Sequence, residues 1–171
     1  MNLSSYFSIG FLLIVSLVAG ALTIVGPDRV WQLFGSPDLG PVTFEKLVRR
    51  ITPNDALACL PSICNTKIDI NSPVFPVTAR DLQVALAKVI ESEPRMSLVA
   101  ADEANLTYRY IQRSKWLRFP DTVIVRLLDL PNGQSTILIY SRSQLGKGDL
   151  GVNRARIRRW LDTFVAQQNV G

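Results

Sequence analysis

The feature that most constrains this chain is an uncharged apolar run near its N-terminus, "YFSIGFLLIVSLVAGALTIV", residues 6–25. Twenty residues of α-helix rise about 30 Å, which matches the thickness of the hydrocarbon core of a bilayer. A Gly-Pro pair follows the run and ends the helix. The run therefore predicts a transmembrane anchor in the lipid bilayer over residues 1–27, then a juxtamembrane linker over residues 28–52 and an extracytoplasmic α+β domain over residues 53–171.

A cleaved signal peptide is the alternative interpretation of the same run. Signal peptides begin with positive charge, whereas the first Lys or Arg of this chain is Arg29. The run is also longer than the apolar region of about 7–15 residues in a signal peptide. The small residues at positions 19–21 nevertheless resemble a cleavage site. We expect an uncleaved anchor, with cleavage left open.

Two features disagree about the side of the membrane on which the domain lies. The cations that follow the run, from Arg29 to Arg50, favour the cytoplasm under the positive-inside rule. The only two cysteines, Cys59 and Cys64 in "CLPSIC", are suited to a disulfide and hence to an oxidising compartment, although two unpaired thiols are the alternative. We give the cysteines more weight and predict an inner-membrane protein with its C-terminal domain in the periplasm.

The pattern of residues beyond position 77 predicts regular structure. Thr78, with Asp81 three residues later, matches a capping box, so a helix begins there and Pro94 ends it. Strand-like alternation follows over residues 96–102, 106–114, 121–130 and 135–143, and Asn132-Gly133 marks a hairpin. A last helix is expected over residues 154–167. The predicted fold class is α+β, with a small antiparallel sheet of about four strands and helices packed on one face. Residues 52–77 are expected to be irregular.

The residue types exclude several kinds of active site. The chain has no histidine, which removes the usual general base and the commonest metal ligand. Two cysteines without another soft ligand are too few for zinc or an iron–sulfur cluster. We therefore predict no metal, no cofactor and no enzyme activity. A hydrolase or transferase that works through carboxylates stays possible, and its candidate residues are Asp121, Asp129, Asp149 and Asp162.

The formal net charge of +5 suits an acidic partner, either anionic lipid headgroups or an acidic protein surface. Nucleic acid is not expected as a partner, because no nucleic-acid-binding motif is recognisable.

The segment "SRSQLGKGDLGVNRARIRRW", residues 141–160, has the least usual pattern. Asn153 is placed to cap the last helix, so Arg154 and Arg156 fall in its first turn, where the helix dipole disfavours cations. They need anions nearby, and Asp149 and Asp121 are the candidates.

Two interpretations of this segment stay open. In one, an Arg–Asp network pins the loop to the sheet. In the other, the segment binds an anion or an acidic group of a partner at a helix N-terminus. The residues of that candidate site are Arg142, Lys147, Asp149, Asn153, Arg154 and Arg156.

The same segment resembles the domain-of-unknown-function family 1499, whose members show S-R-S-x-x-G-x-x-D-L-G-x-N-x-x-R near the C-terminus and an R-F-P-D-like segment upstream. Matching positions run from Ser141 to Arg156, and from Phe119 to Asp121. The resemblance covers roughly residues 55–165 and departs from the family's commoner pattern at "CLPSIC". It implies an extracytoplasmic domain of uniform fold, and it implies no reaction.

Three functions follow as expectations. The first is a non-catalytic single-pass membrane protein, an accessory subunit that docks a basic periplasmic domain on an integral membrane complex, for which an electron-transport complex is one candidate. The second is a periplasmic module that binds a small anion or a lipid headgroup. The third is the carboxylate-based hydrolase or transferase.

Overall fold

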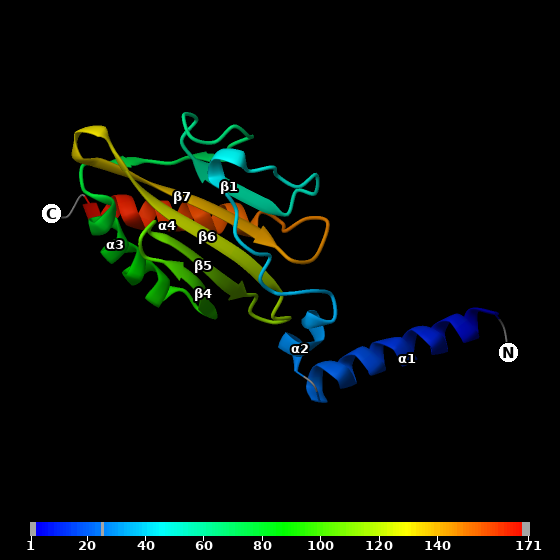
Figure 1. Cartoon of the computed structure of the whole chain (residues 1–171). Helices are drawn as coiled ribbons and strands as arrows, with labels where there is room; N and C mark the ends of the chain where they lie inside the picture. Colours follow the sequence, from blue (N-terminus) through cyan, green and yellow to red (C-terminus); the bar gives the residue numbers. More distant parts are fainter. Residues whose placement is uncertain (1–2, 25, 169–171) are drawn as a thin grey trace.

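The computed structural model describes the backbone of residues 3–24 and 26–168. Its central element is a seven-stranded mixed sheet in the order β2-β1-β7-β6-β5-β4, with β3 also paired to β7 (Figure 1). The strands are β1 (Asp55–Cys59), β2 (Ile70–Asn71), β3 (Val74–Phe75), β4 (Met96–Asp102), β5 (Thr107–Arg113), β6 (Pro120–Leu130) and β7 (Gln134–Ser143). The helices are α1 (Leu3–Ile24), α2 (Pro27–Gln32), α3 (Ala79–Ser92) and α4 (Val152–Gln168), with short 3-10 turns η1 (Phe44–Lys46) and η2 (Pro131–Gly133). The chain thus has an α+β fold.

The antiparallel meander from β4 to β7 is present as the alternation of residues predicted. Asn132 and Gly133 join β6 to β7 with φ values of 63° and 71°, a left-handed backbone that these two residue types tolerate. The capping box of α3 is also confirmed, because the Thr78 side chain accepts from the Asp81 amide while Asp81 accepts from the Thr78 amide.

Helices α3 and α4 cover one face of the sheet (Figure 1). The apolar faces of these helices meet the inward side chains of the meander in one core, which includes Leu82, Trp160, Phe164, Val125 and Ile139. Burial of this apolar surface is the main force that holds the helices to the sheet.

The opposite face of the sheet is covered by irregular chain rather than by helices. Phe44 of η1 packs there with Leu57 and Tyr140 in a second apolar cluster. The predicted disulfide is confirmed: Cys59 and Cys64 are bonded, with their Cα atoms 6.2 Å apart, inside this cluster.

The prediction of about four strands, all antiparallel, is wrong. Strands β1, β2 and β3 lie in residues 52–77, which were expected to be irregular, and β1 pairs with β2 in parallel. The pattern was missed because β2 and β3 are two residues long, and because β1 is buried at four consecutive positions and so shows no alternation.

The prediction of a transmembrane helix is also wrong. Residues 6–24 lie in α1, but among residues 3–24 and 26–168 no helix is both long and apolar enough to cross a membrane.

Candidate functional site

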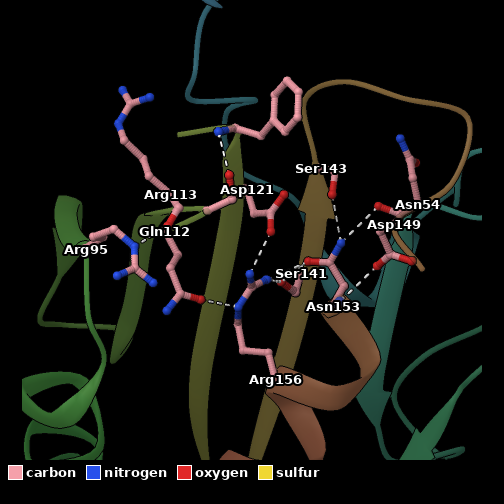
Figure 2. A network of polar contacts seen from close by, with 12 residues as sticks. Asn54, Arg95, Gln112, Arg113, Asp121, Ser141, Ser143, Asp149, Asn153 and Arg156 are labelled. Carbon is pink, nitrogen blue, oxygen red and sulfur yellow. Dashed lines mark hydrogen bonds and ion pairs between the residues drawn. The ribbon is translucent and has the colours of Figure 1, made fainter. Parts of the chain in front are cut away.

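Arg156 lies beneath the sheet in the first turn of α4, and it is only 4% exposed (Figure 2). Its Nε donates to the side-chain oxygen of Gln112. Its Nη1 donates to Ser141 Oγ and Asn153 Oδ1, both at 2.6 Å, and its Nη2 donates to Asp121 Oδ2 at 2.6 Å. Every guanidinium nitrogen therefore has a partner within the chain, and a carboxylate balances the buried charge.

Asn153 belongs to the same buried network and does not cap the helix. Its Nδ2 donates to the Asn54 carbonyl at 3.1 Å and to Ser143 Oγ at 3.0 Å, while its Oδ1 accepts from the Ser141 hydroxyl at 2.6 Å. The helix begins two residues earlier than expected, at Val152, and the Asn153 side chain turns inward to the sheet. Asn153 thus joins the β1 side of the sheet to α4.

Asp149 takes the capping position instead. Its Oδ1 accepts from the Gly151 amide and its Oδ2 from the Asn153 amide, each at 2.9 Å. A carboxylate in this position satisfies amides that the helix leaves free and is stabilised by the helix dipole. The protein's own side chain therefore occupies the place where an external anion would bind.

The network extends to the other helix through Gln112 and Glu93. Gln112 donates to Glu93 Oε2 at 2.7 Å, and Glu93 Oε1 accepts from Arg159 Nη2 at 2.6 Å and Trp160 Nε1 at 2.8 Å. Burial raises the pKa of the Glu93 carboxyl, but these three donors outweigh it and hold the pKa below the ordinary value of 4.5. Charged and polar contacts thus fasten the end of α3, strand β5 and α4 together.

Of the six residues predicted to form a binding site, the structure brings Asp149, Asn153 and Arg156 together. Arg142 points to the opposite face, because successive residues of β7 alternate sides. There its Nη2 donates to the carbonyls of Leu39 and Gly40 at 2.6 and 2.8 Å.

Arg142 is also partly buried over the ring of Tyr140, 5.6 Å from its centroid, and this burial lowers the pKa of the guanidinium. The other two cations lie at the surface. Lys147 is exposed in the loop before α4, and Arg154 is exposed with only a 3.4 Å contact to the Asp69 carbonyl. Ligand or partner binding by the six residues stays a prediction.

A cavity of about 290 Å³ lies next to this network, between the β5–β6 loop, residues 114–119, and the β7–α4 loop, residues 144–151. Most of its lining is apolar, and the polar groups of Asp121 and Ser143 come from the ends of β6 and β7. The apolar lining residues are Phe119, Pro120, Leu145, Leu150 and Val152. The glycines of residues 146–151 indicate a loop, but no pattern in the sequence links that loop to residues 114–119.

Large apolar side chains are exposed on the same two loops and beside them, after α2. We call this set the loop-end patch: Leu33, Phe34, Trp116, Leu117 and Leu150. Leu150 is fully exposed and has a φ of 54°, which is unusual for a leucine.

The segment after α2 is fastened to both loops. The ring of Trp31 lies 4.5 Å from that of Phe119, and its Nε1 donates to the Leu117 carbonyl at 2.5 Å. Gln144 donates to the carbonyls of Gly35 and Ser36 at 2.6 and 2.8 Å. These contacts hold the parts of the loop-end patch at one end of the sheet, where α2 and the two loops meet (Figure 1).

Comparison with known proteins places the chain in one family. Residues 51–164 match the family described as "Protein of unknown function (DUF1499)", in agreement with the resemblance of the C-terminal segment. No curated protein matches the chain. The matched region contains β1 to β7, α3, both loops and nearly all of the buried network. Since the match covers about two thirds of its length, the chain belongs to the DUF1499 family.

Proposed function

We propose that this protein is an accessory subunit that docks on a larger protein complex through the loop-end patch. The observation that carries the proposal is the exposure of Trp116 and Leu150, which are 81% and 103% exposed. Large apolar side chains gathered on a surface mark protein interaction sites, and tryptophan is enriched among the residues that dominate binding energy.

The charges beside the patch favour a partner with acidic residues around an apolar area. Lys115 and Lys147 lie in the same two loops and are exposed, and Arg154 is exposed in the first turn of α4. The Lys115 ammonium lies 4.8 Å from the centre of the Trp116 ring, so cation and aromatic surface are presented together. Such charges steer association more than they add to affinity.

Helix α1 supports a partner with extended apolar surface. Phe11, Leu13 and Leu17 are 68%, 65% and 75% exposed, and α1 extends away from the sheet (Figure 1). An integral membrane complex offers apolar surface of this kind. The buried disulfide is suited to the oxidising, periplasmic side of such a complex.

The proposal is tested by extraction from native membranes in mild detergent, followed by native electrophoresis and affinity copurification. The wild-type protein is expected to migrate with a large assembly. The double variant Trp116→Ser/Leu150→Ser is expected to lose it, while Val84→Ser, which removes an exposed apolar residue of α3, keeps it. A wild-type protein that migrates as a free monomer would refute the proposal.

A further inference from the structure

The charged side chains that line the cavity between the two loops are all carboxylates. Its polar side chains are Ser114, Asp121, Ser143 and Asp149, and no lysine or arginine is among the residues that line it. The walls are apolar, and the volume of about 290 Å³ is near the lower end of the range for small-molecule sites. The cavity therefore has room for one ring or short chain with a single polar end.

The polar groups differ in what they leave available to a ligand. Both oxygens of Asp149 already accept backbone N–H groups. Asp121, which is 9% exposed, uses Oδ2 for Arg156. Figure 2 shows its other carboxylate oxygen pointing away from Arg156, and that oxygen accepts no hydrogen bond from the described residues. Ser143 Oγ accepts from Asn153, which leaves the hydroxyl proton unused.

We propose that this cavity binds a small apolar amine, with its ammonium group donating to Asp121 Oδ1 and its apolar body against Phe119, Leu145 and Val152. Asp121 Oδ1 is not fully buried, so a donor in the cavity reaches it, and an ammonium N–H donates a strong, charge-assisted hydrogen bond to a carboxylate. An anionic ligand would bring its charge beside two carboxylates with no cation in the lining to receive it. The site therefore selects against the carboxylates and phosphates that the arginine-rich sequence suggests.

Three probes of one shape test this selection by calorimetry on the full chain at pH 7: benzylamine, benzyl alcohol and benzoate. We expect benzylamine to bind at least tenfold more tightly than benzoate, with benzyl alcohol in between. Equal or tighter binding of benzoate overturns the proposal, and so does benzyl alcohol that binds as tightly as benzylamine. Absence of binding by all three also overturns it.

Two variants locate the site. Asp121→Asn is expected to remove the preference for benzylamine over benzyl alcohol while benzyl alcohol still binds, which reports an intact cavity. Because Asp121 also holds Arg156, that variant can fail to fold, and Val152→Phe provides the second test. Val152 is 51% exposed, so a larger side chain fits without repacking the core and fills the cavity. Benzylamine that still binds Val152→Phe as it binds the wild type would overturn the proposal.

The inference stands apart from the docking proposal. If the amine does not bind while the native assembly is retained, only the proposal of amine binding is refuted. Loss of the assembly with unchanged amine binding refutes docking alone.

Discussion

The buried network around Arg156 and the loop-end patch adjoin each other and are opposite in character. In the network, Arg156 is 4% exposed and all of its nitrogens have partners. In the patch, Trp116 and Leu150 are mostly or fully exposed, although both residue types are stabilised by burial. The polar groups of the network find all their partners within the chain. The apolar side chains of the patch are stabilised only when another surface covers them.

This difference separates stability from binding. A polar group with all its partners in place has little to offer a ligand, and its removal leaves other buried groups unpaired. An exposed apolar side chain contributes little to folding and is available to a partner. We therefore expect substitutions in the network to change stability, and substitutions in the loop-end patch to change association.

The largest expected effect is that of Arg156→Met. The substitution keeps most of the side-chain volume but leaves the Asp121 carboxylate and the Gln112 side-chain oxygen without their donor. We expect the free energy of unfolding to fall by about 3–5 kcal/mol, measured by urea denaturation.

Arg154→Met is the matched control, because Arg154 lies two residues earlier in α4, is exposed, and makes one long side-chain contact with the residues that the structure describes. It should change the free energy of unfolding by less than about 0.5 kcal/mol. Equal losses in the two variants would refute the distinction between the two arginines.

Glu93→Gln tests the far end of the network and its pH dependence. Because the pKa of Glu93 is lower in the folded protein, its charged form stabilises the fold above the unfolded-state pKa, and this contribution is lost as the pH falls through the folded-state pKa. We expect a loss of about 2 kcal/mol at pH 7. The difference from wild type should shrink steadily below pH 4.5.

The control for this prediction is Glu91→Gln, two residues away and exposed on α3. Its effect should be small at every pH. A difference between Glu93→Gln and wild type that is the same at pH 7 and pH 3 would show that the carboxylate charge is not what matters.

Much of the fold follows from local patterns in the sequence. The contacts that join distant parts of the chain in the buried network do not. The meander and the α3 capping box are encoded by alternation and by residues three apart, so the sequence predicts them. The pairing of Arg156 with Asp121 was one of two candidates, and it needs the register in which β6 lies beside β7. Asn153 was expected to cap α4 because the sequence shows only the residues next to a cap, whereas its actual partners lie just before β1 and on β7.

The loop-end patch is harder to predict, because no local pattern in the sequence shows which apolar side chains of a loop are exposed to solvent. Trp116 and Leu117 sit in a polar loop, and Leu150 lies between Asp149 and a glycine, so nothing in the sequence marks them as neighbours. They meet only because both loops end at the same edge of the sheet and are fastened to the segment after α2.

Asp149→Ala removes the carboxylate that caps α4, and we expect a smaller loss of about 1 kcal/mol in the free energy of unfolding. Asp149→Asn keeps only one of the two acceptor oxygens and should recover part of the loss. Thermal denaturation of the two variants side by side measures the contribution of the cap. No recovery in Asp149→Asn would mean that a single oxygen acceptor does not hold the loop.

The most direct test of the central claim is the Trp116→Ser/Leu150→Ser double variant, measured both for unfolding and for copurification from native membranes. Both side chains are exposed, so we predict a free energy of unfolding within about 0.5 kcal/mol of wild type and loss of the large assembly. A double variant that stays in the assembly at the wild-type level would contradict the account, because the exposed apolar surface would then have no part in docking.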